Sequence, residues 1–256
     1  MHIDWSTTFA AIWRQRKERL RPVRNVDPVA LGDLVGIDRQ KEQLAENTRR
    51  FLAARPANNA LLWGARGTGK SSLVKAVFNE YVDRGLRLIE VDRDDLVYLP
   101  EIVDDVRELP QRFIIFCDDL SFAENENSYK HLKSVLEGSV EQPPDNVLIY
   151  ATSNRRHLLP EAMKDNLDTK IVDGELHYSD AVEEKISLSD RFGLWLSFYP
   201  INTEKYLAIV DQLFAGYNCD REALHEAARS FAQSRASKSG RTARQFYNYY
   251  SSQNTG

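Results

Sequence analysis

One short segment constrains the fold of this chain more than any other. The pattern G-x-x-x-x-G-K-[ST] is matched in full by Gly64-Ala65-Arg66-Gly67-Thr68-Gly69-Lys70-Ser71. An apolar run at 60–63 precedes this segment, and residues 71–83 follow it with the periodicity of a helix. A strand, a glycine-rich loop and a helix in this order are typical of a loop that wraps around phosphate groups.

The residue types in this loop have separate roles in phosphate binding. Glycines let successive backbone N–H groups turn toward phosphate oxygens, and the following helix adds the positive end of its dipole. Lys70 is expected to reach the β- and γ-phosphates of ATP, and the Ser71 hydroxyl is expected to ligate Mg²⁺. The nucleotide-binding residues predicted from the loop are Gly64, Ala65, Arg66, Gly67, Thr68, Gly69, Lys70, Ser71 and Ser72.

A pair of carboxylates follows another apolar run. The run at 113–117 ends in Asp118 and Asp119. Because the carboxyl ends of parallel strands meet at one edge of a sheet, this pair is expected beside the phosphate loop. Asp118 is predicted to hold Mg²⁺ through water, and Asp119 to polarise the attacking water. The alternative is that the two residues only cap the following turn.

Short apolar runs alternate with amphipathic segments through most of the chain. The predicted strands are 60–63, 87–91, 113–117, 147–152 and 193–198, and the predicted helices between them are 71–83, 100–109 and 129–137. Most of these strands are apolar throughout, as expected where helices cover both faces of a parallel sheet. The predicted fold class is therefore α/β, with a five-stranded parallel sheet at its core.

The strand signals stop after Pro200, and three helical spacings follow. They are Tyr206, Val210 and Leu213; then Leu224, Ala228 and Phe231; then Phe246, Tyr249 and Tyr250. These helices predict a small lid at 201–256, after an α/β core at 31–200. The charged stretch at 161–185 lacks clear periodicity and is expected to be an exposed insertion in the core.

Residues 1–30 are predicted to precede the core as an amphipathic helix and a basic linker. Trp5, Phe9, Ile12 and Trp13 recur with the spacing of one helical face. The bases that follow are Arg14, Arg16, Lys17, Arg19, Arg21 and Arg24, opposed only by Glu18. We interpret the segment as a docking helix with a solvated basic tail, and a phosphate- or partner-binding role stays open.

With these motifs identified, the chain resembles the AAA+ ATPases from about residue 31 to the C-terminus. It is most similar to an uncharacterised family of bacterial AAA+ ATP-binding proteins. The stretches that carry this similarity are Pro56-Ala-Asn-Asn-Ala-Leu-Leu-Trp-Gly64, Phe116-Cys-Asp-Asp-Leu-Ser-Phe122, Ser153-Asn-Arg-Arg-His-Leu-Leu-Pro160 and Ser187-Leu-Ser-Asp-Arg-Phe-Gly-Leu-Trp195. The resemblance implies a P-loop core, a helical lid and a site that binds ATP and Mg²⁺.

The resemblance also implies roles for residues outside the two motifs. Asn154 is similar to sensor 1, which holds the attacking water or contacts the γ-phosphate. Arg191 looks like an arginine finger that enters a neighbouring subunit's site, although a simple surface salt bridge is the alternative. Arg244 is preferred over Arg241 as sensor 2. Val35 and Ile37 would flank adenine, and they fit equally well as core residues.

Composition limits the remaining function classes. The formal net charge of −4 gives no general reason to expect nucleic-acid binding, although the bases and aromatic residues after residue 227 leave that role open for the lid. Cys117 and Cys219 are expected to be reduced thiols of a cytoplasmic protein. No apolar run is long enough to cross a membrane, and the five histidines show no metal-ligand spacing.

The sequence therefore predicts an AAA+ ATPase that works as a homo-oligomer. Its site would form between subunits, and hydrolysis would remodel or load an unknown protein or nucleic-acid client. The alternative is an ATP-dependent switch or scaffold with little turnover. Asp119 keeps this alternative open, because many ATPases of this class have Glu at that position.

Overall fold

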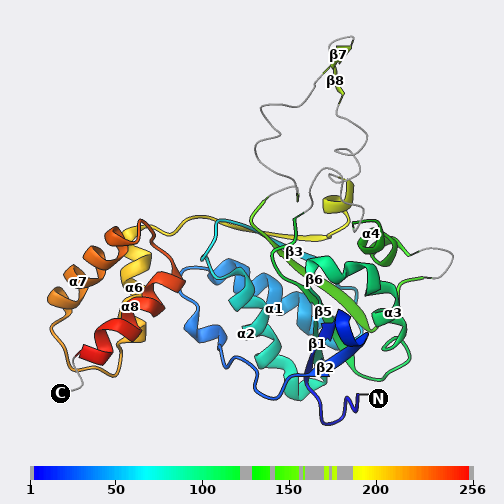
Figure 1. Cartoon of the computed structure of the whole chain (residues 1–256), viewed down its shortest axis with the longest axis horizontal. Helices are drawn as coiled ribbons and strands as arrows, with labels where there is room; N and C mark the ends of the chain where they lie inside the picture. The colour runs from blue at the N-terminus through cyan, green and yellow to red at the C-terminus, as the bar shows by residue number, and fades with distance from the viewer. Residues whose placement is uncertain are drawn as a thin grey trace.

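A seven-stranded sheet forms the centre of the protein (Figure 1). The computed structural model describes residues 3–121, 129–138, 142–155, 158, 170–172, 175–177 and 187–253. The strand order is β2-β1-β4-β5-β6-β3-β9. All neighbours pair in parallel except β1 and β2, which form an antiparallel hairpin at the edge.

The five predicted strands form the body of this sheet, and their ends agree with the prediction to within one residue. They are β3 (Ala60–Gly64), β4 (Leu86–Glu90), β5 (Arg112–Cys117), β6 (Val147–Ser153) and β9 (Leu194–Phe198). Side chains along β5 alternate between two buried clusters, with Phe113 and Ile115 in one and Ile114 and Phe116 in the other. Burial on both faces explains why these strands are apolar throughout.

The predicted N-terminal helix is wrong. Residues there form β1 (Ala10–Arg14), the 3-10 turn η1 (Gln15–Lys17) and β2 (Arg19–Pro22), and β1 pairs in parallel with β4. Trp5 and Trp13 are nearly buried, and the Trp5 ring meets Phe113 edge-on at 5.0 Å between centroids. Pairing with β4 on one side and β2 on the other overrides the local helical pattern, because tertiary contacts outweigh local propensity.

Helices cover both faces of the sheet (Figure 1). On one face lie α1 (Asp38–Leu52) and α2 (Lys70–Tyr81), and on the other lie α3 (Leu99–Asp104) and α4 (Tyr129–Glu137). The helix predicted at 129–137 is confirmed. The one predicted at 100–109 ends early, at Asp104, and turns continue to residue 108. Three further 3-10 turns are η2 (Leu31–Asp33), η3 (Val82–Arg84) and η4 (Arg93–Tyr98).

The three helices after the sheet pack around a core of their own. They are α6 (Thr203–Leu213), α7 (Arg221–Ser234) and α8 (Gly240–Gln253), here called the lid. Asn202 and Asp220 cap the first two, each accepting a hydrogen bond from a backbone N–H. Tyr206, Phe214 and Phe246 are almost fully buried in this core. The aromatic residues of the lid therefore serve mainly in packing.

Three further sequence expectations concern the insertion, the cysteines and membrane-spanning helices. The insertion predicted at 161–185 lies outside the described residues, except for the antiparallel strands β7 (Lys170–Val172) and β8 (Glu175–His177). Both cysteines are free, and burial raises the pKa of the Cys117 thiol to about 12. In the described part of the chain, no helix has the length and apolar character needed to span a bilayer.

A buried polar cluster fastens α1 to the centre of the sheet. The Tyr150 hydroxyl on β6 lies 2.8 Å from Thr48 Oγ1 and 3.0 Å from Asn47 Nδ2. Asn47 also bonds the backbone of Asn58 through both of its amide atoms. Burial raises the pKa of Tyr150 to about 12, so its hydroxyl stays protonated and can donate.

Tyr150→Phe is expected to lower the free energy of unfolding by about 1 kcal/mol, because one buried hydrogen-bonding group is removed while the ring still fills its space. Urea unfolding measures the change. Tyr199→Phe is the matched control, since Tyr199 is 70% exposed. Equal effects of the two substitutions would show that the cluster does not stabilise the fold.

Candidate functional site

The glycine-rich loop begins where β3 meets the end of β9. Gly64 has a φ of 135°, and a Cβ added there would lie 1.9 Å from the carbonyl oxygen of Phe198. The Ala65 N–H donates to the same oxygen at 3.1 Å. Only glycine fits this junction, so the first position of the motif is fixed by packing as well as by conformation.

Lys70 lies at the centre of the loop and is only 7% exposed. Its ammonium group donates to the carbonyl oxygens of Gly64 and Ala65, both at 2.8 Å, and to Asn154 Oδ1 at 3.1 Å. Burial lowers the pKa of Lys70, while the charges of Asp118 and Asp119 raise it. The loop therefore holds a positive charge at one fixed point, next to two carboxylates.

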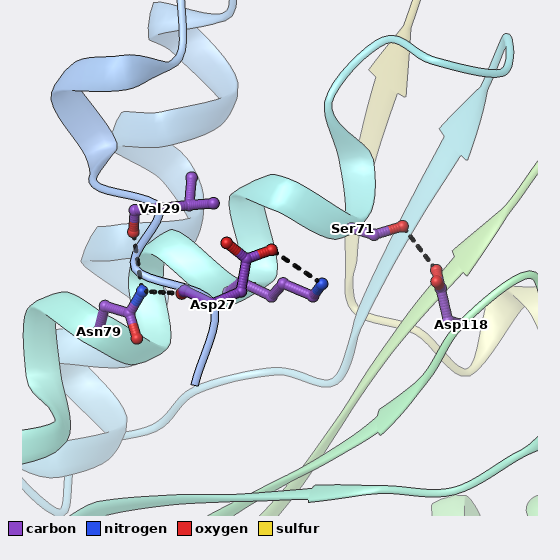
Figure 2. Close-up of polar contacts among 6 residues, drawn as sticks. Asp27, Val29, Ser71, Asn79 and Asp118 are labelled. Carbon is purple, nitrogen blue, oxygen red and sulfur yellow. Dashed lines mark hydrogen bonds and ion pairs between the residues drawn. The ribbon is translucent and has the colours of Figure 1, made fainter. Parts of the chain in front are cut away.

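Ser71 and Asp118 form the pair predicted to bind metal. The Ser71 hydroxyl donates to Asp118 Oδ1 at 2.6 Å, as Figure 2 shows, and the Thr152 hydroxyl donates to the same oxygen. A hydroxyl and a carboxylate are hard oxygen ligands, which suit Mg²⁺ when phosphate oxygens and water complete its shell. Within the described residues, no group of three or more His, Cys, Asp or Glu side chains offers another metal site.

Asp119 is turned toward Asn154 by its backbone. Its φ of 52° is left-handed, a conformation that Asp tolerates better than most residues. The Thr152 hydroxyl oxygen accepts the Asp119 N–H at 3.0 Å, and the Asn154 amide donates to the Asp119 carboxylate. Asn154 thus contacts both Lys70 and Asp119, and the two strand ends form one hydrogen-bonded network.

A cavity of about 800 Å³ opens in front of this network. Its polar end is formed by the loop from Arg66 to Ser72 together with Asp118, Asp119, Thr152 and Asn154. The predicted residues Val35 and Ile37 line the cavity with the apolar side chains Leu34, Ile201, Ile209 and Leu213. Arg241 and Arg244 both line the cavity from α8, so the lining does not distinguish which of the two is the predicted sensor 2 residue.

Residues 23–30, here called the strap, form a wall of this cavity. Asn79 on α2 donates to the carbonyl oxygens of Asp27 and Val29, both at 2.8 Å (Figure 2). The Asp27 carboxylate lies 3.3 Å from the Lys75 ammonium, one helical turn beyond Ser71. Asp27, Pro28, Val29 and Lys75 all line the cavity.

The lid closes the cavity from the other side. The Gly240 N–H, at the start of α8, donates to the Gly67 carbonyl oxygen at 3.1 Å. A Cβ on Gly67 would lie 2.7 Å from Ser239 Cβ, so the loop and the lid are in close contact. Ser239 is buried and its hydroxyl accepts the Thr242 N–H, which caps α8 at this contact.

Arg191 is the one predicted site residue that lies apart from the others. It forms an ion pair with Glu137 at the end of α4, and it donates to the carbonyl and hydroxyl oxygens of Ser187. It does not line the cavity of its own chain. Gly64 and Ala65 are also absent from the cavity wall, but they contact Lys70 through their carbonyl groups.

Comparison with known proteins assigns this arrangement to a family. The sequence profile of "Protein of unknown function (DUF815)" matches residues 6–254, almost the whole chain. The chain belongs to the DUF815 family.

More distant similarities place the DUF815 protein in the AAA+ superfamily. It is 38% identical over 69 residues to the Replication factor C large subunit of Staphylothermus marinus, covering 27% of this chain and 16% of that protein. It is 26% identical over 197 residues to ATP-dependent zinc metalloprotease FTSH 7, chloroplastic, of Oryza sativa subsp. japonica, covering 63% of this chain and 23% of that protein. The DUF815 chain thus spans less than a quarter of either curated relative.

A solved structure supports the same fold. The Thermotoga maritima RuvB Holliday junction branch migration motor matches with a TM-score of 0.51 and 13% sequence identity. The match covers 88% of the DUF815 chain and 72% of the RuvB chain. At this identity the likeness concerns the fold alone, and the fold is that of AAA+ proteins, with an α/β core and a helical C-terminal part.

Sequence reasoning missed three parts of the DUF815 site. Thr152 of β6 bonds both Asp118 and Asp119. Its position two residues before the predicted site residue Asn154 is the sequence signal that could have identified it. For the strap the sequence predicts only a linker, because nothing in that segment shows that Asn79 holds it. The contact between Gly67 and Ser239 joins segments far apart in the chain and leaves no local pattern.

Asn79→Ala is expected to release the strap from α2, because it removes the donor of two hydrogen bonds worth about 1 kcal/mol each. Hydrogen exchange should show residues 23–30 exchanging several-fold faster, with the helices of the core unchanged. Asn248→Ala, an exposed asparagine on α8, is the control. Unaltered exchange in the strap would mean that other contacts hold it.

Proposed function

We propose that this protein is an ATP hydrolase of the AAA+ type whose active site forms between two subunits. The observation that carries this proposal is the network of Lys70, Ser71, Asp118, Asp119 and Asn154 at one end of a cavity with an apolar opposite end. A polar end for a triphosphate and an apolar end for a base are what ATP requires.

The cavity residues suggest how ATP would lie. Backbone N–H groups of the loop and the Lys70 ammonium would bind the phosphates, with the start of α2 adding its dipole. The base would lie between the residues before α1 and those of the lid. The side chains that would flank it are Val35, Ile37, Ile201, Ile209 and Leu213.

The hydroxyl of Ser71 and the carboxylate of Asp118 would hold Mg²⁺, directly or through water. The metal would supply positive charge to the phosphate oxygens as negative charge develops there. Thr152 would orient the Asp118 carboxylate, since its hydroxyl donates to the same oxygen that accepts from Ser71. In this part of the site, the Ser71 and Thr152 hydroxyls already converge on one oxygen of Asp118.

Asp119 and Asn154 would position the attacking water. The water oxygen would bond the γ-phosphorus in line with the leaving ADP, and the bond between that phosphorus and the β,γ-bridging oxygen would break. The proton of the water would pass to the Asp119 carboxylate and then to solvent. Asn154 would hold the water through its amide, while its bond to Lys70 keeps it near the γ-phosphate.

Arg191 would complete the site of a neighbouring subunit in a homo-oligomer. It lies outside its own chain's cavity, at the end of α4, where Glu137 and Ser187 hold its guanidinium. A cation inserted from the next subunit would stabilise the charge that develops on the transferred phosphoryl group. On subunit contact, the Arg191 guanidinium would leave Glu137 and contact the phosphate of the neighbouring site. Subunit contact would thereby be coupled to catalysis.

The lid would carry the output of the cycle. Its first residue in α8 bonds Gly67, and Arg244 or Arg241 reaches the cavity from the same helix. Loss of the γ-phosphate would therefore change the angle between lid and core. We propose that this motion remodels or loads an unknown protein or nucleic-acid client in the cytoplasm.

A nucleotide-dependent switch with little turnover is the second candidate. The observation that favours it is the direct bond between the Asn154 amide and the Asp119 carboxylate. Asp119 is one methylene shorter than glutamate, and water must compete with Asn154 for its oxygen. In this case ATP binding alone would move the lid.

A mixing experiment tests whether the site is shared. Lys70→Ala chains, which lack the phosphate-binding cation, and Arg191→Ala chains, which lack the finger, are each expected to lose at least about 100-fold in ATP turnover. When the two are mixed, some interfaces combine an intact Lys70 with an intact Arg191. Turnover should return to a substantial fraction of wild type, and it should rise with protein concentration.

Arg49→Ala is the matched control, because it removes an ion-paired surface arginine on α1. It should leave turnover unchanged. If Arg191→Ala only lowers the thermal midpoint and mixing restores nothing, Arg191 is a structural ion pair. If wild-type turnover is negligible at every concentration although ATP binds, the switch replaces the hydrolase.

A further inference from the structure

The β1–β2 hairpin carries a dense basic surface on an acidic chain. Six bases lie between residues 14 and 24, with Glu18 as the only acid among them, while the chain has a net charge of −4. All six side chains are exposed: Arg14, Arg16, Lys17, Arg19, Arg21 and Arg24. The hairpin is also the edge of the sheet, so its outer strand pairs with no further strand of the described chain.

The register of the hairpin places three of these arginines on one face. Arg14 pairs with Arg19 and Ile12 with Arg21, and cross-strand partners point to the same side of a sheet. Trp13 and Leu20 form the intervening pair and pack into the core on the other side. Like charges directly opposite each other destabilise a hairpin, so stability alone does not account for this pair.

Few groups nearby neutralise this charge. No ion pair of the described residues joins any of the six bases to an acid. Two carboxylates lie near the hairpin. Asp95 in η4, which is only 8% exposed, interacts with Arg14, and Glu90 of β4 pairs with Ile12 and so lies on the face of the three arginines, but neither forms an ion pair with any of the six bases. Charges on an edge strand also discourage pairing with another sheet, but that role does not require like charges opposite each other.

We propose that this hairpin face binds the phosphate backbone of a nucleic acid. Directly opposite residues have Cβ atoms about 5 Å apart and diagonal ones about 7 to 8 Å, so the three guanidinium groups can reach successive phosphates of one strand. Arginine suits this role, because its planar fork bonds phosphate oxygens two at a time. A membrane surface is less suitable, since Trp13 and Leu20 point into the core and cannot enter lipid.

The hairpin surface is separate from the ATP cavity. None of the six bases lines that cavity. Five of them lie in the hairpin, and Arg24 lies in the strap just after β2, but only Asp27, Pro28 and Val29 of the strap line the cavity. Nucleic-acid binding by the hairpin would be a function in addition to ATP hydrolysis, and it can be measured in the absence of ATP. Failure of one proposal leaves the other standing.

Fluorescence anisotropy with labelled single-stranded and duplex DNA of mixed sequence tests the proposal. Wild type should bind with an affinity that falls steeply between about 50 and 200 mM salt. Arg19→Gln combined with Arg21→Gln should weaken binding at least about tenfold at low salt and reduce the salt slope by about one for each arginine. Binding should be insensitive to sequence.

The control variant is Arg229→Gln combined with Arg235→Gln, which removes two exposed arginines from the lid. It has the same change in net charge and should bind as wild type does. The hairpin variant should keep its thermal midpoint, or raise it at low salt, because the repulsion of Arg19 with Arg14 is removed.

Two results would overturn the proposal. Wild type that does not bind either DNA, or equal losses in the hairpin and lid variants, would mean that the hairpin is not a nucleic-acid surface. Concentration-dependent self-association that disappears in the hairpin variant, with DNA binding unchanged, would show that a second copy of the chain occupies this face.

Discussion

The site depends on the parallel register of three neighbouring strands. Trp63 of β3 pairs with Ser153 of β6, and Cys117 of β5 pairs with Ala151 of β6. All three strands therefore end at the same edge, and the residues that follow them meet there. Lys70, Asp118 and Asn154 come from distant parts of the chain, yet hydrogen bonds through Asp119 and Thr152 join them into one network. A slip of one residue in any pairing would turn the terminal side chains to the opposite face.

Around this fixed edge, two less tightly held segments enclose the cavity. The strap is held on one side by Asn79 and Lys75, and the lid touches the loop on the other side through Gly240 and Ser239. Val23 and Val26 of the strap also pack against the buried core of the sheet, whereas the lid meets the glycine-rich loop at a few close contacts, and the lid and the sheet each have their own buried cores. Such contacts can break without unfolding either part, which is what a moving lid needs.

The sequence predicted those features that local patterns determine. Continuous apolar runs located five strands to within one residue, and the motif that predicts roles for Lys70 and Ser71 lies between β3 and α2 as expected. It failed at the N-terminus, because Trp5, Phe9, Ile12 and Trp13 have helical spacing while the partner of β1 lies far along the chain. The strap and the role of Thr152 were missed for the same reason, since tertiary contacts create them. Arg191 stays a prediction, because a single chain does not contain the interface at which it would act.

The pairing of β1 with β4 has a consequence for synthesis of the chain. Ala10 pairs with Leu88, so roughly 80 residues separate the first strand from its partner, and at about 5 to 20 residues per second the ribosome needs on the order of 4 to 16 seconds to make them. During that time Trp13, which is 7% exposed in the folded protein, has no core to enter. The arginines beside it keep the nascent segment charged and disfavour aggregation while it waits. Folding of the sheet therefore finishes at its N-terminal edge only after β4 has left the exit tunnel.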